Sequence, residues 1–364
     1  MGIDHVTTFY MNSIHPDISI IVPIFNEEAE LPGLLDSLSA QQNVRFELIL
    51  CDGGSSDGSQ QLYFEHAAGS CFPVRLIQAT RGRGCQMNAG TAVASSGLLL
   101  FLHADSRFDE CDALYKAVAL YRRQTASGSR YFAARFSLRF RRSEHSPSPA
   151  WFYYEAKARL PRSDCIRGDQ GFLLNRNLLA LTGGFDESLP FLEDVRLVES
   201  LAAHVTWLLV PTVISTSARR FEKEGLWERQ VLNAIIINSI ATEWTEFFSA
   251  LPGLYRCQTD TGRLQLHPIL KGISMLIAGH DHAWCCNFWR GTGRHVAGNA
   301  WQIFFWLDVR RAFRAGKTAG EVNSSSLDFY RRRLEPFFQS RIAAFLAQSA
   351  VKLWLCRMLL RGTS

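Results

Sequence analysis

Short apolar runs alternate with polar turns along the first hundred residues of the chain. The runs are rich in Val, Ile and Leu and read ISIIVPIF, FELILCD, VRLIQA and GLLLFLHAD. A turn of Gly, Ser, Asn or Asp follows each run, and a longer segment with helical spacing comes next. Continuous apolar runs indicate strands covered on both faces, and helices between them indicate right-handed crossovers. The pattern predicts a Rossmann-like α/β fold, with a mixed, mostly parallel sheet flanked by helices.

The pattern changes after residue 130. The segment YFAARFSLRF alternates and is typical of an antiparallel strand at one edge of the sheet. HSPSPA reads as a loop before a helix from Trp151, and TWLLVPTVIS reads as the last strand.

From Glu222 onward the periodicity is helical and no strand is evident. We expect breaks at LPG, residues 251–253, and at Gly-rich turns near 291–298. The expected organisation is a tail over 1–16, an α/β domain over 17–221 and a mostly helical C-terminal region over 222–364.

Composition narrows the class of protein. The 364 residues carry a net charge of +5 with scattered Lys and Arg, so a small phosphorylated ligand fits and a nucleic-acid partner is not indicated. Nine cysteines, an odd number without paired spacing, favour reduced thiols in a cytosol-like compartment. The N-terminus lacks the basic start and apolar core of a secretory signal.

The apolar stretches fall short of the roughly 20 residues that a membrane-spanning helix needs, so we expect a soluble protein. The C-terminal segments WQIFFWLDV and AAFLAQSAVKLWLCRMLLR are expected to be core helices or a subunit interface, such as that of a homodimer. Lys352 and Arg357 leave peripheral membrane contact open. In AGHDHAWCC, the residues His280, His282, Cys285 and Cys286 lack C-x-x-C spacing, which favours ordinary structural roles over a zinc site.

Polar side chains gather where three of the predicted strands end. Asp52 follows FELILC, the cluster Asn26, Glu27 and Glu28 follows ISIIVPIF, and Asp105 follows GLLLFL. Each cluster alone reads as a helix cap, but in α/β sheets ligands bind at the carboxyl ends of strands, so together they favour a shared site. A carboxylate such as Asp52 can accept hydrogen bonds from a uracil ring or a ribose, and Gly53 permits close approach.

The segment HAD places His103 and Asp105 on one side of an extended chain. Asp105 suits one oxygen ligand of Mg²⁺ or Mn²⁺, whereas His103 fits metal ligation, a phosphate contact or a structural role. RGRGCQMNAG lacks the third glycine of a dinucleotide fingerprint, but Arg81 and Arg83 at a helix start suit a diphosphate, with a solvated basic turn as the alternative.

Together these motifs resemble those of the family 2 glycosyltransferases of GT-A fold. The resemblance runs through SIIVPIFNEE, LILCDGGSSDGS, GRGCQMNAG, LLLFLHADS, RGDQGFLLNR, GGFDESLPFLEDVRL and TSARRF, in order, over about residues 17–225. Within the family the chain is most similar to the bacterial branch of radical-SAM/selenodomain-associated transferases. His103 stands where the broad family has the first Asp of its D-x-D metal motif.

The resemblance implies a set of roles. The nucleotide-sugar donor would be held by Pro23, Asn26, Glu27, Asp52, Gly53, Arg81, Arg83, Gln86, Asn88, His103, Ala104 and Asp105, with Asp105 as the metal ligand. The sugar and acceptor would meet Gly168, Asp169, Gln170, Gly171, Arg219 and Arg220. The catalytic base would come from Glu193 or Asp194, which point about 100° apart on a helix, and the family pattern favours Asp194.

The sequence therefore predicts a cytoplasmic inverting transferase, peripheral to the inner membrane surface if it contacts membrane at all. It would use a divalent cation, Mg²⁺ or Mn²⁺, to move a sugar from a nucleotide-sugar, with UDP favoured, to a small-molecule, lipid-linked or peptide acceptor. Two alternatives stay open: a non-catalytic nucleotide or carbohydrate binder that keeps the fold, and a nucleotidyltransferase.

Overall fold

The chain divides into two compact units, which are described separately. The computed structural model describes residues 15–67, 69–129, 131–189, 191–254 and 262–361. The first unit holds the described residues up to Arg141 together with Lys157–Ser217, and the second holds Arg142–Ala156 with the described residues from Ala218 on. The second unit thus includes residues 142–156, which the sequence placed in the α/β domain.

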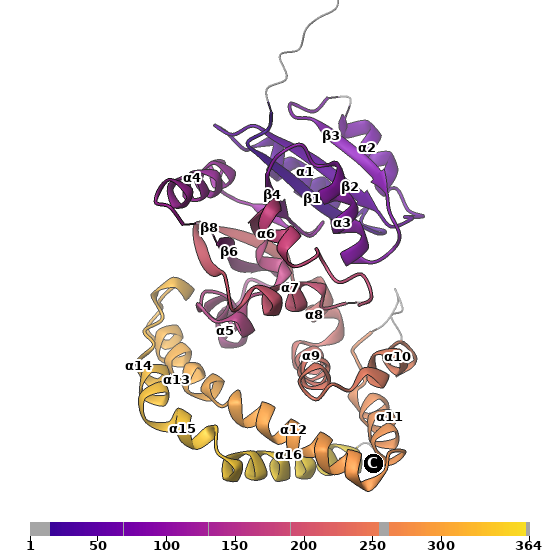
Figure 1. Ribbon diagram of the computed structural model, residues 1–364, viewed down its shortest axis with the longest axis vertical. Coiled ribbons are helices and arrows are strands. Elements are labelled where there is room, and N and C mark those ends of the chain that lie inside the picture. Colours follow the sequence, from indigo (N-terminus) through magenta and orange to yellow (C-terminus); the bar gives the residue numbers. More distant parts are fainter. Residues whose placement is uncertain (1–14, 68, 130, 190, 255–261, 362–364) are drawn as a thin grey trace, which may run out of the picture. The chain divides into compact units, whose positions relative to one another are not determined.

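One mixed sheet organises the first unit (Figure 1). Its order is β3-β2-β1-β4-β7-β6-β8-β5 within the described residues. Strands β1, β2, β3 and β4 run parallel, β7 is antiparallel to β4 and β6, and β8 pairs parallel with β6. The bounds are β1 Ile18–Ile24, β2 Phe46–Asp52, β3 Val74–Gln78, β4 Leu98–Phe101, β5 Arg107–Phe108, β6 Phe132–Arg141, β7 Phe172–Asn175 and β8 Thr206–Ser217.

Helices cover both faces of this sheet. Alternate residues of a strand point to opposite faces, so Ile20 joins one core cluster and Ile21 the other. The first cluster includes α1 and α4, with α2 packed against it, and the second includes α3, α6 and α7. The bounds are α1 Leu31–Ser39, α2 Ser59–Ala67, α3 Arg83–Val93, α4 Ala113–Ala126, α6 Arg176–Leu181 and α7 Glu193–Leu201. Every residue of β1 is buried, which explains its continuous apolar run.

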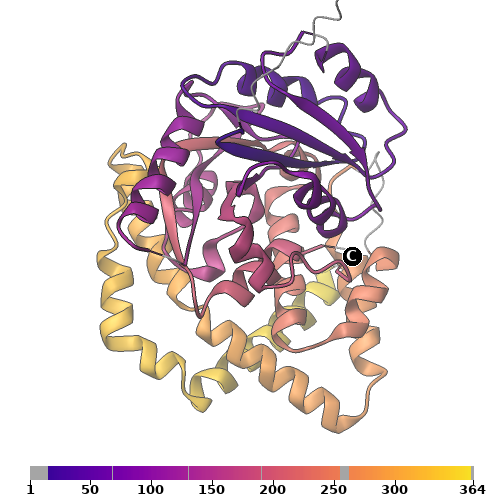
Figure 2. The ribbon, with the colours of Figure 1, turned by 45° about the horizontal axis from the view of Figure 1, so that its top comes forward.

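The described secondary structure of the second unit consists of helices joined by loops (Figure 2). The bounds are α5 Pro149–Lys157, α8 Arg219–Glu224, α9 Leu226–Ala241, α10 Thr245–Leu254, α11 Leu266–Ala278, α12 His282–Gly298, α13 Trp301–Arg314, α14 Ser325–Phe329, α15 Glu335–Phe338 and α16 Arg341–Arg361. The expected fold class, a mostly parallel mixed sheet flanked by helices with a helical C-terminal region, is confirmed.

Three expectations for the second unit are wrong. Helix α10 continues through Pro252, and α12 runs through the glycines at 291–298 without a turn. A glycine is tolerated in α12 because Gly293 contacts a neighbouring helix: a Cβ there would lie 2.2 Å from the Ala344 carbonyl oxygen. The expectation that no apolar stretch reaches the length of a spanning helix is also wrong, because Arg341–Leu360 is long and apolar enough to cross a membrane. Only 11% of its apolar window is buried, so α16 is not a core helix, and its role in a subunit interface stays a prediction.

Candidate active site

The carboxyl ends of the parallel strands meet at one edge of the sheet. Ile24 of β1 lies opposite Asp52 of β2, and Ile21 of β1 lies opposite Phe101 of β4. The loops after these strands therefore begin side by side, as the sequence predicted. The loop after β4 carries Asp105.

Hydrogen bonds join the loop after β1 to the loop after β2. The backbone amide of Asn26 donates to the Ser55 hydroxyl (3.0 Å), and the Asn26 side-chain oxygen accepts from the Ser56 amide (2.8 Å). Glu28 accepts from the Gly58 amide at 3.1 Å. Asn26 has a φ of 54°, a left-handed conformation that asparagine tolerates better than most residues. Asn26 thus shapes the edge of the site.

Asp52 is fully buried and surrounded by donors. One carboxylate oxygen accepts from the Ser55 amide (2.9 Å) and hydroxyl (2.6 Å), and the other accepts from Gln60 (2.7 Å) and Gln78 (3.1 Å). Burial alone would raise the pKa of Asp52, but these hydrogen bonds outweigh it and lower that pKa. A nucleoside would have to replace one of these donors, so a direct contact with Asp52 stays a prediction.

Gln86 and Asn88 of α3 hold neighbouring backbone. The Gln86 amide donates to the carbonyls of Ile24 (2.8 Å) and Cys51 (2.7 Å). Gly53 faces the same side chain, since a Cβ there would lie 3.1 Å from Nε2 of Gln86. Asn88 exchanges two hydrogen bonds with the backbone of Phe185.

Other predicted donor residues lie at the same sheet edge. Pro23 is in β1, opposite Cys51 of β2, and the Glu27 amide donates to the Ser59 hydroxyl at 2.9 Å. Ala104 is buried between His103 and Asp105. Whether any of these residues touches a donor stays a prediction.

The two arginines at the start of α3 have different neighbours. The Arg81 guanidinium carbon lies 3.8 Å from the centre of the Phe25 ring. Nη1 of Arg83 lies 3.7 Å from Oε1 of Glu193, at the start of α7. Only Arg83 therefore reaches the catalytic acids that the sequence predicted.

Four carboxylates from separate loops gather in the first unit. Asp105, Asp169, Glu193 and Asp194, here called the acid cluster, interact electrostatically with one another or with Arg83 and His103. Asp105 follows β4, Asp169 lies in the turn Gly168–Gln170 before β7, and the other two acids open α7.

Asp194 is fixed by two backbone donors. Its Oδ2 accepts from the Gly168 amide and its Oδ1 from the Val195 amide, each at 2.8 Å. A Cβ at Gly168 would lie 3.0 Å from Nε2 of His103 and 3.4 Å from Oδ2 of Asp194. Gly168, His103 and Asp194 therefore meet closely, and a Cβ at residue 168 would require these side chains to shift by a few tenths of an ångström.

Asp105 is held by the last long strand. Its Oδ2 accepts from the Thr216 hydroxyl (3.1 Å) and the Ser217 amide (3.3 Å), and its carbonyl accepts from Arg141 (2.9 Å). Sequence reasoning missed these positioning residues. The only available signal was the polar STS at the end of an otherwise apolar strand.

Burial, together with neighbouring negative charge, raises the pKa of two acids in the cluster. Burial raises the pKa of Asp169 to about 7, and the charges of Asp194 and Asp105 add to the increase, whereas Arg167 and Arg83 oppose it. Its Oδ1 is buried without a hydrogen-bond partner among the described residues. Burial, then the charge of Asp194, also raises the pKa of Glu193, which is 1% exposed. Leu192, just before it, has a φ of 71°, a strained left-handed conformation.

His103 lies at the centre of these charges. Burial lowers its pKa to about 4 and the positive charge of Arg83 adds to the decrease, while Asp105 and Asp194 oppose it. The imidazole is therefore neutral at neutral pH. A neutral ring nitrogen can accept a hydrogen bond or ligate a metal ion.

The donor set fits a divalent cation that takes most of its ligands from elsewhere. No three His, Cys, Asp or Glu residues in the described parts of the chain form a preformed metal group. Asp105 offers a hard carboxylate oxygen and His103 a neutral nitrogen, and Asp169 has a buried oxygen without a partner. Mg²⁺ and Mn²⁺ commonly bind one or two carboxylates and complete their shell with phosphates and water.

The turn that carries Gly168 and Asp169 is built around a buried arginine. Arg135 of β6 is 1% exposed and donates to the carbonyls of Ala158 (2.6 Å) and Leu160 (2.7 Å) and to Gln170 (3.1 Å). Gln170 in turn donates to the Cys165 carbonyl. Gly171 has a φ of 66°. Sequence reasoning assigned Gln170 to the ligand and missed Arg135, which in an alternating strand looks like a surface residue.

Arg219 and Arg220 belong to the second unit and are not among the residues that the first unit brings together. Nε of Arg220 lies 3.2 Å from Glu224, one turn along α8. Their predicted contact with the donor stays a prediction.

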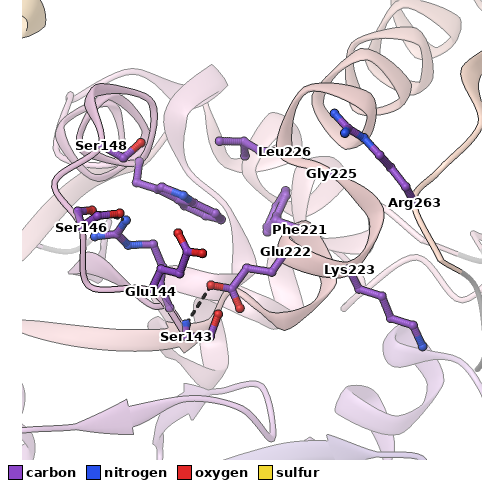
Figure 3. A pocket seen from close by; sticks show the side chains of 12 residues that line it. Ser143, Glu144, Ser146, Ser148, Phe221, Glu222, Lys223, Gly225, Leu226 and Arg263 are labelled. Atoms are coloured by element: carbon purple, nitrogen blue, oxygen red, sulfur yellow. Dashed lines mark hydrogen bonds between the residues drawn. The ribbon is translucent and has the colours of Figure 1, made fainter.

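The second unit contains a polar pocket of about 580 Å³ that the sequence did not predict (Figure 3). Glu144 and Glu222 line it with Ser143, whose amide donates to Glu222 at 2.8 Å. Trp151 and Phe221 form an edge-to-face pair there, with ring centres 5.7 Å apart. None of the acid cluster residues lines this pocket.

Part of the chain is similar to known glycosyltransferases. The family model for glycosyl transferase family 2 matches residues 19–181. A segment of 93 residues is 38% identical to an undecaprenyl-phosphate 4-deoxy-4-formamido-L-arabinose transferase of Aeromonas hydrophila, over 24% of this chain and 28% of that protein. A segment of 107 residues is 38% identical to a PGL/p-HBAD biosynthesis glycosyltransferase of Mycobacterium bovis, over 29% of this chain and 41% of that protein. The matches span less than half the length of these relatives.

Solved structures show a fainter likeness. S. aureus TarS 1-349 in complex with UDP gives a TM-score of 0.48 at 17% identity, over 86% of this chain and 91% of that one. The mannosyltransferase PcManGT from Pyrobaculum calidifontis, in complex with GDP-Man and Mn²⁺, gives 0.46 at 16% identity, over 93% and 88%. Residues 19–181, which carry Asp105 and Asp169 of the acid cluster, are thus similar to glycosyl transferase family 2.

Proposed function

We propose that the protein is an inverting glycosyltransferase that moves a sugar from a nucleotide-sugar, with UDP as the favoured nucleotide, to an acceptor hydroxyl. The family match supports sugar transfer. The observation that carries the mechanism is the Asp194 carboxylate, oriented by two backbone amides beside His103 within the acid cluster. The HAD motif supports assignment to the radical-SAM/selenodomain-associated branch of this family. The comparisons do not distinguish between branches.

Asp194 would act as the general base. A free oxygen lone pair of its carboxylate takes the proton of the acceptor hydroxyl, and the hydroxyl oxygen attacks the anomeric carbon of the donor. The bond from that carbon to the diphosphate oxygen breaks on the opposite face, and the electron pair leaves with the diphosphate. Attack and departure on opposite faces invert the configuration of the sugar.

Positive charge would stabilise the leaving diphosphate. Arg83 is placed for this role because it already lies beside the acid cluster. Asp105 would hold a divalent cation, Mg²⁺ or Mn²⁺, which when bound neutralises charge on the diphosphate. Glu193, buried against Arg83, would orient that guanidinium, so we assign it a positioning role.

The class of acceptor and the cellular location are inferred from two further observations. The A. hydrophila relative carries a lipid phosphate in its name, and a lipid-linked acceptor is one of three classes that fit, beside small molecules and peptides. Eight cysteines among the described residues are free thiols, which supports a cytoplasmic location.

The test compares Asp194→Asn with the wild type. Release of UDP from UDP-sugars in Mn²⁺ reports slow donor hydrolysis, and calorimetry reports UDP affinity. Loss of a general base should slow turnover by about 10²–10⁴-fold, whereas UDP affinity should stay within about twofold, because Asp194 is not among the residues expected to hold the nucleotide.

Glu199→Gln is the matched control, because it removes an exposed carboxylate from the same helix. It should behave like the wild type. Turnover that survives in Asp194→Asn would exclude Asp194 as the base. Binding of UDP without turnover in the wild type would favour a non-catalytic sensor.

A further inference from the structure

Helix α16 is apolar on two opposite sides. Along its 21 residues, one side is buried against the rest of the second unit and the other is exposed. Large apolar side chains occur on both sides. A helix of this kind needs an apolar partner on each side to remove its surface from water.

The inner side of α16 is covered by neighbouring helices of the second unit. It runs beside α12, as the yellow and orange helices show in Figures 1 and 2. Ala343 and Ala344 are buried, and Gly293 of α12 allows the backbones to approach. Near its C-terminal end, Leu355 joins an apolar cluster with Leu270 of α11. The helix is therefore anchored along its length.

The outer side of α16 has no such cover. Its large apolar residues are exposed by 55–71%, and no described segment of the chain packs over them: Ile342, Phe345, Leu346 and Leu353. Single exposed apolar residues are ordinary, but a row of them on one helix marks a surface that binds something apolar. We call these four residues the outer face.

The segment that carries the outer face is rich in basic residues. From Ser325 to Arg361 the sequence holds two acids, Asp328 and Glu335, and seven basic residues: Arg331, Arg332, Arg333, Arg341, Lys352, Arg357 and Arg361. Arg331 pairs with Asp328 at 3.5 Å, and Lys352 lies 5.1 Å from the centre of the Trp289 ring. An apolar face flanked by basic side chains complements a surface with buried acyl chains and anionic phosphates.

We propose that the outer face of α16 docks the protein onto an anionic phospholipid membrane, with the helix lying in the plane of the interface. Crossing the bilayer would place Lys352 near the hydrocarbon centre, where a charge is costly, and would strip α16 from α12. Lying flat lets Lys352 and Arg357 reach lipid phosphates while Phe345 and Leu353 enter the acyl region.

The test is co-sedimentation of the full chain with lipid vesicles. Binding to phosphatidylcholine vesicles containing phosphatidylglycerol should exceed binding to pure phosphatidylcholine by about tenfold, because each basic residue near an anionic surface adds to the attraction. The double variant Phe345→Glu/Leu353→Glu should lose binding to both. Arg331→Gln/Arg332→Gln/Arg333→Gln should reduce the preference for phosphatidylglycerol and leave binding to pure phosphatidylcholine unchanged.

Leu181→Glu is the matched control, since Leu181 is 69% exposed on α6 of the first unit, and it should bind like the wild type. Circular dichroism melting would verify that each variant is folded. Three results would overturn the proposal: no binding by the wild type, unchanged binding by the folded double variant, or release only by detergent, which indicates a spanning helix. A dimer that the double variant breaks, without vesicle binding, would identify a second copy as the occupant instead.

Discussion

At the scale of single residues, Asp169 has the most perturbed carboxyl group of the acid cluster. Its pKa is raised from an ordinary value of 3.8 to about 7 by burial and by neighbouring carboxylates. A carboxyl group that resists ionisation in the folded protein, but not in the unfolded chain, makes stability depend on pH.

The sign of this dependence follows from proton binding. Between about pH 4 and 7 the unfolded chain releases the Asp169 proton while the folded protein keeps it, so the free energy of unfolding falls as the pH rises. Asp169→Asn should remove this part of the slope and be more stable than the wild type at pH 8, by on the order of 2–4 kcal/mol. Urea unfolding in the presence of EDTA, repeated at several pH values, measures the free energy of unfolding of both proteins.

An exposed aspartate on α1 supplies the control. Asp36→Asn should keep the slope of the wild type. Parallel stability curves for the wild type and Asp169→Asn would show that Asp169 is not perturbed as described.

Residue identities at the site were easier to predict than residue contacts. Asp105 and Asp194 could be found because strand ends and a family motif mark their positions. The hydrogen-bond donors that hold these two carboxylates could not be predicted. Thr216 and Gly168 lie close to the acids only after distant segments have packed. Gln86 shows the same limit, since its role as a clamp on two carbonyls depends on the register of β1 and β2.

At the scale of elements, the contact between α12 and α16 depends on one glycine. A Cβ at Gly293 would lie 2.2 Å from the Ala344 carbonyl oxygen and 2.9 Å from Cβ of Gln348, and backbone cannot move aside cheaply. Gly293→Ala should therefore lower the free energy of unfolding by about 1–3 kcal/mol, as measured by chemical denaturation.

Gly298, the last residue of α12, provides a matched control, because a Cβ there would meet nothing within 4 Å. Gly298→Ala should be neutral or stabilise by up to about 1 kcal/mol, since alanine favours the helix. Equal effects of the two substitutions would mean that the helices do not approach so closely.

Some elements were predictable from the sequence and others were not. Strands β1, β2 and β4 were predictable, because a strand covered on both faces is apolar without interruption. The glycines of α12 misled the prediction, because glycine marks a turn and a close helix contact alike. The two residues of β5 carry too little pattern to detect.

At the scale of the whole molecule, ligands should stabilise the folded chain. UDP at a hundred times its dissociation constant would add about 2.7 kcal/mol, and a cation that bridges UDP to Asp105 would add more. We expect UDP with Mn²⁺ to raise the melting temperature further than UDP alone. Asp105→Asn should lose the Mn²⁺-dependent part of this increase in melting temperature and keep the part due to UDP alone, as measured by thermal shift.

Asp109→Asn is the comparison variant, because Asp109 lies four residues away and pairs with Arg139 instead. It should retain the Mn²⁺ effect. A full Mn²⁺ effect in Asp105→Asn would place the cation elsewhere. Screening other nucleoside diphosphates in the same assay would identify the donor base.

The second unit is assembled from two stretches of chain, and this affects synthesis. Tyr153 of α5 donates to Gln302, 149 residues later, and its ring packs on Phe305. At roughly 5–20 residues per second, a ribosome leaves α5 waiting on the order of ten seconds for these neighbours. During that interval a nascent polypeptide displays uncovered aromatic rings, which makes this stretch a natural client for chaperones.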